Sequence, residues 1–298
     1  MAEMDLAAPG GTVAPGARPF THGRADVISY PVTALGTRTR VVESIGGGVP
    51  LVCLHGAGSR ADRWVPAVPG LVAAGYHVYA IDLPGHGLAD KPAGWDYTAA
   101  GFATFVSAVL DELGLSGVTV AGTSLGAHVA ARMALARPDQ VSSLVLIGAI
   151  GLVPLPAENM TPPAVLADAS ESGVRRKLAL LVADPLMVTD AWVREESMIN
   201  SSAGATAALT EVAGFLLGPC NDDLQAAALL GAGLGDSVLL VWGEDDRWTP
   251  LAMGTAAHAA LPGSTLAVMP GCGHAPYFED PDSFARIMAE RRAAPTRS

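Results

Sequence analysis

The chain is 298 residues long, half of them hydrophobic and only 16% charged, with a formal net charge of −11. This length and apolar content suit one large globular domain, or a core with an insertion, and exclude a disordered chain. The acidic balance argues against a surface for nucleic acid or for an anionic membrane. We therefore expect neither of these as a partner.

The three cysteines, Cys53, Cys220 and Cys272, stand at unrelated spacings that form neither a disulfide framework nor a zinc site. Residues 1–25 are rich in Ala, Gly and Pro and lack the basic and apolar regions of a signal peptide. No apolar run reaches transmembrane length. We expect a flexible tail over 1–25, a cytoplasmic location, no metal and no cofactor.

Short apolar runs alternate with helical patterns over most of the chain. Strands are predicted over 26–31, 37–44, 50–54, 78–81, 118–121, 145–147, 238–242 and 265–269. Helices are predicted over 63–74, 98–113, 127–136, 251–260 and 283–292. This alternation indicates a parallel sheet with helices on both of its faces.

Residues 152–236 interrupt the alternation. The segment opens with several prolines, and its later part is helical in pattern over 174–183, 191–199, 205–217 and 224–230. No linker isolates it at both ends, so we interpret it as a helical cap rather than a separate domain. The predicted organisation is a tail (1–25), a core (26–151 and 237–298) and the cap (152–236).

A Gly-x-Ser-x-Gly motif, Gly122-Thr123-Ser124-Leu125-Gly126, stands between a predicted strand and a predicted helix. A serine nucleophile on a sharp strand-to-helix turn needs this arrangement, with glycines where neighbouring backbone crowds the turn. The first amides of the following helix then point toward the place where an oxyanion would form. The motif predicts Ser124 as a nucleophile.

A serine hydroxyl becomes a good nucleophile when a base takes its proton and a third group orients that base. His274 follows a strand by a short loop, which brings it to the sheet edge where open α/β sheets bind ligands. Asp246, also just past a strand, is the preferred acid, with Asp245 and Glu244 as alternatives. Ser, Asp, His is one of three known chain orders for this geometry.

The same chemistry needs two N–H donors for the oxyanion. Leu125 supplies one because it directly follows the nucleophile at the start of a helix. The other is expected from the small-residue loop 55–58 after the first buried strand, where we assign Ala57, with Gly58 as the alternate.

Five motifs together resemble the α/β-hydrolase superfamily. They are His55-Gly56-Ala57-Gly58, Asp82-Leu83-Pro84-Gly85-His86-Gly87, Gly122-Thr123-Ser124-Leu125-Gly126, Gly243-Glu244-Asp245-Asp246 with Pro250, and Gly273-His274. The resemblance spans about residues 26–292. It implies the α/β-hydrolase fold: a mostly parallel eight-stranded sheet, helices on both faces and an α-helical cap. It also implies that Asp246 is the triad acid, that His274 is the general base, and that His55 and Asp82 serve loop structure.

Serine at the elbow indicates acyl transfer to water, since an aspartate there would have suggested haloalkane or epoxide chemistry. We expect a serine hydrolase that cleaves a carboxylic ester or lactone through an acyl-enzyme. Its substrate is predicted to be small and apolar or amphipathic. Candidates for the pocket wall, or else for core packing, are Trp64, Trp192, Trp242 and Trp248.

Two alternatives remain open. Residues 182–190 resemble the cap segment of the meta-cleavage-product C–C hydrolases, which makes cleavage of a vinylogous diketone the first alternative. Those enzymes usually carry a Trp after the catalytic His, an Asn before the nucleophile and an Arg late in the cap segment. This chain has Ala275, Thr123 and Glu196 there, with Arg194 nearby. The second alternative is a non-catalytic small-molecule-binding protein of the same fold. The sequence does not determine the oligomeric state.

Overall fold

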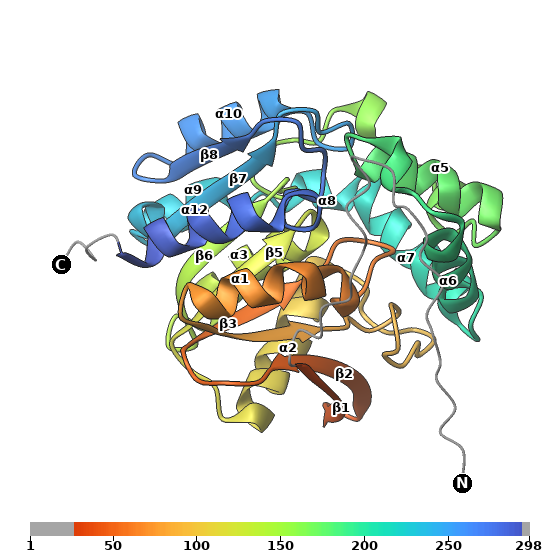
Figure 1. Ribbon diagram of the computed structural model, residues 1–298, viewed down its shortest axis with the longest axis horizontal. Coiled ribbons are helices and arrows are strands. Elements are labelled where there is room, and N and C mark those ends of the chain that lie inside the picture. The colour runs from red at the N-terminus through yellow and green to blue at the C-terminus, as the bar shows by residue number, and fades with distance from the viewer. Residues whose placement is uncertain (1–26, 294–298) are drawn as a thin grey trace, which may run out of the picture.

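The centre of the protein is an eight-stranded sheet with the strand order β1-β2-β4-β3-β5-β6-β7-β8 (Figure 1). The structure is a computed structural model and describes residues 27–293, so the predicted tail over 1–25 lies outside the described residues. The strands are β1 (Val27–Ala34), β2 (Thr37–Ser44), β3 (Val49–Leu54), β4 (Tyr76–Ile81), β5 (Val118–Thr123), β6 (Val141–Ile147), β7 (Val238–Gly243) and β8 (Thr265–Met269). The pairs β1–β2 and β2–β4 are antiparallel and the other pairs are parallel. The predicted mostly parallel eight-stranded sheet is confirmed.

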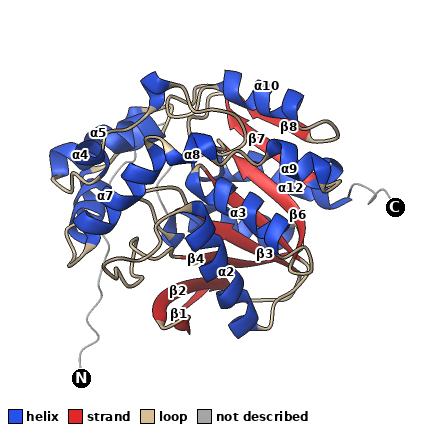
Figure 2. Ribbon diagram, turned by 180° about the vertical axis from the view of Figure 1, so that it is seen from behind, coloured by secondary structure: helices blue, strands red, loops and turns tan. Residues whose placement is uncertain are grey.

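Helices cover both faces of this sheet, as predicted. The core helices are α1 (Val68–Ala73), α2 (Ala99–Leu113), α3 (Leu125–Ala136), α10 (Leu251–Ala260), α11 (Pro276–Glu279) and α12 (Pro281–Ala293). One apolar cluster joins α2, α3 and α10 to the sheet, and a second joins α1 and α12 to its other side. Figure 1 accordingly shows α1 and α12 in front of the strands. Figure 2, seen from behind, shows α2 and α3 in front of the opposite face of the sheet. Every residue of β5 and β7 is buried, because both faces of these central strands are covered.

Between β6 and β7 the chain is helical, and residues 152–236 are called the helical insertion below. Its α-helices are α4 (Pro163–Leu166), α5 (Glu171–Leu181), α6 (Asp190–Asn200), α7 (Ala205–Leu216), α8 (Pro219–Asp222) and α9 (Ala226–Gly231). Its 3₁₀ turns are η2 (Ala157–Asn159) and η3 (Pro185–Met187), and a further turn, η4 (Gly235–Ser237), leads from it into β7. Figures 1 and 2 both show α5 and α7 gathered beyond one end of the sheet.

Prolines account for the main differences from the predicted elements. The pattern of 63–74 predicts one α-helix, but the structure has a 3₁₀ helix, η1 (Ala61–Ala67), followed by α1. Pro66 lies inside η1 and Pro69 in the first turn of α1, and proline has no N–H to donate to the carbonyl four residues earlier. The four-residue helices α4, α8 and α11 were not predicted. Each begins with proline and makes a single turn, which is too short for a helical period to show.

The turn from β5 to α3 is strained and tightly packed. Ser124 has φ 53° and ψ −116°, a backbone conformation that costs free energy in any residue other than glycine. A Cβ added to Gly122 would lie 2.1 Å from the carbonyl oxygen of Gly126. A Cβ added to Gly126 would lie 2.6 Å from the carbonyl oxygen of Leu54, at the end of β3. The turn therefore requires glycine on both sides of the serine.

We predict that Gly126→Ala lowers the free energy of unfolding by about 1–3 kcal/mol, because its Cβ would overlap backbone that cannot move aside. Urea unfolding followed by circular dichroism measures the change. The matched control is Gly214→Ala, at an exposed position in α7 with open space around the glycine. That variant is expected to gain about 0.5–1 kcal/mol. Equal stability of Gly126→Ala and the wild type would contradict the packing described here.

Candidate active site

His274 and Asp246 meet at the end of the sheet, each on a loop that follows a strand. The Nδ1 atom of His274 lies 2.7 Å from Oδ2 of Asp246, and both side chains are buried. With Nδ1–H donated to the carboxylate, Nε2 of His274 keeps the lone pair that can accept a proton. The two alternative acids, Asp245 and Glu244, are exposed and make no ion pair with His274 among residues 27–293.

The carboxylate of Asp246 is held by its own loop. Its Oδ1 accepts hydrogen bonds from the backbone N–H groups of Trp248 and Thr249, each at 2.8 Å. Its Oδ2 accepts a further bond from Oγ1 of Thr249 at 2.9 Å. Three donors besides the imidazole fix the carboxylate, so its orientation toward His274 does not depend on that one contact.

A second carboxylate, that of Glu279 in α11, organises the loop that carries His274. It accepts backbone hydrogen bonds from Gly273 at 2.9 Å and Ala275 at 3.1 Å, the two residues that flank the histidine. It also accepts one from Ala183, in the helical insertion, at 2.7 Å. Burial raises the pKa of Glu279 above its ordinary value, while these backbone donors act in the opposite direction. Glu279 thus joins the histidine loop to the insertion.

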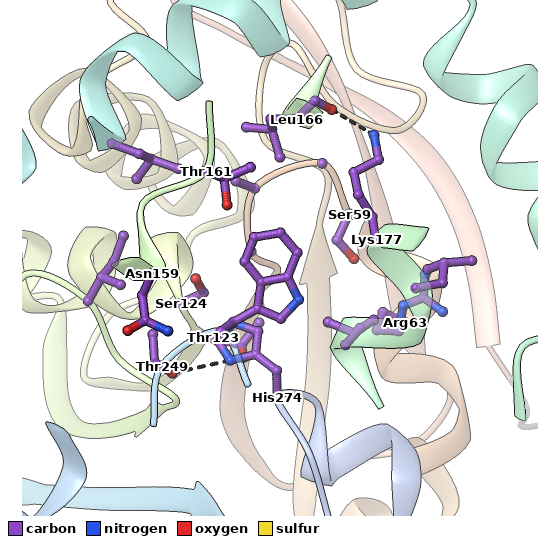
Figure 3. Close-up of a pocket in the computed structure, with 18 of the residues that line it drawn as sticks. Ser59, Arg63, Thr123, Ser124, Asn159, Thr161, Leu166, Lys177, Thr249 and His274 are labelled. Carbon is purple, nitrogen blue, oxygen red and sulfur yellow. Dashed lines mark hydrogen bonds between the residues drawn. The ribbon is translucent and has the colours of Figure 1, made fainter. Parts of the chain in front are cut away.

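Ser124 and His274 line the same pocket (Figure 3). The loop that contains Ala57 is packed on the serine, since a Cβ added to Gly56 would lie 3.2 Å from the Cβ of Ser124. Ala57 lines the pocket, and Leu125 is the first residue of α3. The predicted nucleophile, base and acid, and the two predicted oxyanion donors, therefore come together at one end of the sheet.

The loop 55–58 is tied to the loop after β4. Nε2 of His55 accepts a hydrogen bond from the backbone N–H of Leu83 at 2.9 Å, and burial lowers the pKa of His55 to about 4. Asp82 accepts bonds from the N–H groups of Ala61 and Leu88 and pairs with Arg40. Both side chains are engaged in holding loops.

The other wall of the pocket comes largely from the helical insertion. Between positions 150 and 216, the apolar side chains that line the pocket are Ile150, Leu155, Leu166, Val174, Leu178, Leu181 and Leu216. The charged lining residues besides His274 are Arg63, Lys177 and Glu196. A mostly apolar wall with a few polar groups is typical of a small-molecule site.

The four tryptophans that the sequence analysis named as candidates for the pocket wall have different positions. Trp64 and Trp242 are fully buried in the two core clusters. Trp192 packs over Arg63, whose guanidinium carbon lies 4.2 Å from the ring centroid. Trp248 alone of the four lines the pocket, 6.4 Å from the His274 ring between centroids.

Sequence reasoning missed four residues of this region: Arg63, Lys177, Thr249 and Glu279. Arg63 and Lys177 line the pocket, and Glu279 holds the histidine loop. Arg63 and Lys177 lie in helical patterns whose charged residues are usually solvated, and Glu279 lies in the unpredicted single turn α11, so nothing local marked them. Thr249 could have been found, because it stands between Trp248 and Pro250 in the motif that was already singled out.

The described part of the chain contains no group of three or more His, Cys, Asp or Glu side chains arranged to hold a metal ion. Cys53, Cys220 and Cys272 are free and buried, and burial raises the pKa of the Cys272 thiol to about 12. Within residues 27–293, no helix is both long and apolar enough to span a membrane. The cytoplasmic location stays a prediction.

Residues 49–281 match the family model of the α/β hydrolase fold, and the chain belongs to this family. It is 32% identical to the dihydrolipoyllysine-residue acetyltransferase component of the acetoin cleaving system of Cupriavidus necator, over 85% of this chain and 66% of that relative. It is 29% identical to a 2-hydroxy-6-oxononadienedioate/2-hydroxy-6-oxononatrienedioate hydrolase of Cupriavidus pinatubonensis, over 82% of this chain and 86% of that relative. The structure of a meta-cleavage product hydrolase from Pseudomonas fluorescens IP01 shares the fold, with a TM-score of 0.76 at 22% identity. The match covers 88% of this chain and 97% of that structure.

The contact between His274 and Asp246 predicts which carboxylate matters for turnover. We expect Asp246→Asn to lower kcat by about 10³–10⁴-fold, because the imidazole loses the anion that orients and stabilises it. Asp245→Asn is the control and is expected to stay within about twofold of the wild type. Ester turnover by the purified variants measures both. Survival of activity in Asp246→Asn with its loss in Asp245→Asn would reverse the assignment.

The carboxylate of Glu279 predicts a positioning effect. Glutamine keeps only one acceptor oxygen, so in Glu279→Gln either the histidine loop or Ala183 faces an NH₂ group instead. We expect kcat to fall about tenfold, the equivalent of one lost hydrogen bond, with KM changed less. The exposed Glu244→Gln is the matched control. An unchanged kcat for Glu279→Gln would show that the histidine loop holds its position without this carboxylate.

Proposed function

We propose that the protein is a serine hydrolase that cleaves a carbon–carbon bond beside a ketone in a vinylogous diketone. One observation carries this proposal: six relatives at 28% or 29% identity, with matches over 81% to 91% of this chain, are named as 2-hydroxy-6-oxononadienedioate/2-hydroxy-6-oxononatrienedioate hydrolases. The names of these relatives favour C–C cleavage over the hydrolysis of an ester or lactone, which was the main expectation from the sequence.

In the proposed reaction, Nε2 of His274 removes the proton of the Ser124 hydroxyl as its oxygen bonds to the ketone carbon. Asp246 stabilises the imidazolium that results. The negative charge on the former carbonyl oxygen is stabilised by the backbone N–H groups of Ala57 and Leu125. The pocket's largely apolar wall lowers the competition from water for these hydrogen bonds.

The carbon–carbon bond then breaks as the carbonyl re-forms. Its electron pair goes to the leaving carbon, where conjugation with the second carbonyl of a vinylogous diketone spreads the charge. His274 returns the proton to that fragment and leaves an acyl group on Ser124. A water molecule, deprotonated by His274, attacks the acyl-enzyme and releases the acid and the free serine.

Ester or lactone hydrolysis is the second candidate, and particular residues favour it. Thr123 stands before the nucleophile and Ala275 after the histidine, where the C–C hydrolases usually carry Asn and Trp. Glu196 stands near the place of their Arg and is buried in an ion pair with Arg63. An ester releases an alkoxide rather than a carbanion, so its cleavage does not require residues that stabilise negative charge on carbon. The same serine, base and acid would serve both reactions.

Two measurements test the proposal. A fluorophosphonate probe should label the wild type and the exposed Ser202→Ala control, but not Ser124→Ala. Turnover of 2-hydroxy-6-oxononadienedioate, followed by the loss of its conjugated absorbance, should exceed that of p-nitrophenyl butyrate in kcat/KM. We expect Ser124→Ala to lower kcat/KM for each of the two substrates by about 10³-fold or more.

The alternatives give different results. Turnover of the p-nitrophenyl ester, with no turnover of the dienedioate, would show that the protein is an ester hydrolase rather than a C–C hydrolase. A folded protein that is neither labelled nor active on either compound would support the non-catalytic binding protein instead.

A further inference from the structure

His128 lies on α3, one turn after Ser124, and the proposed reaction does not use it. Its side chain is fully buried, and its backbone N–H donates to the carbonyl oxygen of Ser124 at 3.3 Å. Burial lowers the pKa of His128 below its ordinary value, while the negative charge of Asp223 acts in the opposite direction. A polar ring is stable in such a position when specific contacts satisfy it.

Two segments at the base of the helical insertion are bonded to each other. They are residues 150–155, which follow β6, and residues 220–225, which return toward the core, and together they are called the stem below. The backbone N–H of Gln225 donates to the carbonyl oxygen of Gly151 at 2.7 Å. The side-chain amide of Asn221 accepts from the N–H of Leu155 at 2.8 Å and donates to its carbonyl oxygen at 3.0 Å. These bonds hold the two segments together as one unit.

The stem packs on the ring of His128. Nε2 of His128 lies 3.1 Å from Oδ2 of Asp223, and Nδ1 lies 3.8 Å from Sγ of Cys220. A Cβ added to Gly151 would lie 2.3 Å from Cγ of the ring, so the outgoing segment can pass there only with glycine. The ring of Phe215, in α7, stacks on the imidazole with 5.8 Å between centroids. Both segments of the stem and α7 therefore meet at one side chain of α3.

Asp223 is the charged group of the stem that faces α3. Its carboxylate is bonded to Arg132, one turn beyond His128, and its Oδ1 accepts from Nε2 of Gln225 at 2.8 Å. A neutral imidazole has one N–H, and the neighbouring carboxylate favours the form that carries it on Nε2. Nδ1 then presents its lone pair to the thiol of Cys220, which is a weak donor. Asp223 thus receives two groups from α3, the imidazole and the guanidinium.

The stem also forms part of the pocket wall. Ile150 and Leu155 line the pocket, and so does Leu216, which directly follows Phe215. His128 and Ser124 are joined by a helical turn, so the contact between the stem and His128 fixes the distance between this wall and the nucleophile. A long acyl chain on Ser124 has to reach the wall, whereas an acetyl group fills only the space beside the serine.

We propose that His128 is a positioning residue that, through Asp223, docks the stem on α3 and so sets which acyl groups fit between Ser124 and the apolar wall. This role rests on the proposed hydrolase function. His128 itself does not line the pocket of the described chain, so its effect passes through the stem. Loss of the contact frees the wall and weakens its packing on a long chain, while the triad keeps its own hydrogen bonds.

Esters of two lengths test this role. KM and kcat are measured for p-nitrophenyl acetate and octanoate, and the rate of labelling by a small fluorophosphonate reports on the triad. We expect His128→Leu and Asp223→Asn each to raise KM for the octanoate about tenfold, the equivalent of one lost hydrogen bond, with KM for the acetate and the labelling rate within about twofold. His128→Gln keeps an N–H donor near the place of Nε2 and should restore most of the wild-type KM. The exposed Asp222→Asn and His258→Leu are the matched controls.

A double-mutant cycle shows whether the two residues act through each other. If they do, His128→Leu combined with Asp223→Asn raises KM for the octanoate no further than the larger single effect, because the second change removes a contact that is already lost. Independent effects would multiply to about a hundredfold, and that result would contradict the coupling.

Hydrogen exchange separates this inference from the proposed function, because it requires no turnover. The amides of Leu155 and Gln225 make bonds that hold the stem together. We expect Asp223→Asn to speed their exchange about tenfold and to leave the amide of Val120, in β5, unchanged. If fluorophosphonate labelling fails while this difference persists, the hydrolase function is wrong and the docking of the stem stands. If labelling and turnover succeed while Asp223→Asn and His128→Leu change neither the exchange nor KM for the octanoate, the role of His128 is overturned.

Discussion

The strained backbone of Ser124 is the constraint on which the rest of the site depends. The combination of φ 53° and ψ −116° is unfavourable for a non-glycine residue and persists where surrounding structure holds it, and here close backbone packing surrounds the turn. Gly122 and Gly126 allow β5, α3 and the end of β3 to approach within distances that any Cβ would prevent. The loop of Ala57 is packed against the same turn, so the predicted nucleophile and the predicted oxyanion donors are positioned by one feature.

The histidine loop depends on a different kind of interaction. The backbone N–H of His274 donates to the carbonyl oxygen of Leu181 at 2.8 Å, and Glu279 binds the N–H groups on either side of the histidine and that of Ala183. Leu181 and Ala183 belong to the helical insertion. The insertion therefore does more than supply an apolar wall, because its backbone helps to hold His274. Changes in the insertion are expected to affect kcat as well as substrate choice.

Electrostatics in the pocket follow from which charges are paired. Glu196, which stands where the sequence comparison with the C–C hydrolases expects an arginine, is the buried partner of Arg63. Burying this carboxylate is tolerable because two guanidinium groups and an indole N–H surround it. Lys177, on the neighbouring helix α5, is left with only backbone carbonyls as partners.

The sequence by itself determined the mostly parallel sheet and marked Ser124 and His274 as candidates, because strand periodicity and short motifs are local signals. It preferred Asp246 as the acid but kept Asp245 and Glu244 as alternatives, and only the loop fold brings Asp246 to the imidazole. The sequence likewise gave no sign of Arg63, Lys177 and Glu279. Their roles arise from contacts between segments far apart in the chain, such as Arg63 with Glu196, 133 residues away. Such contacts exist only once the insertion has folded against the core, so tertiary structure alone decided them.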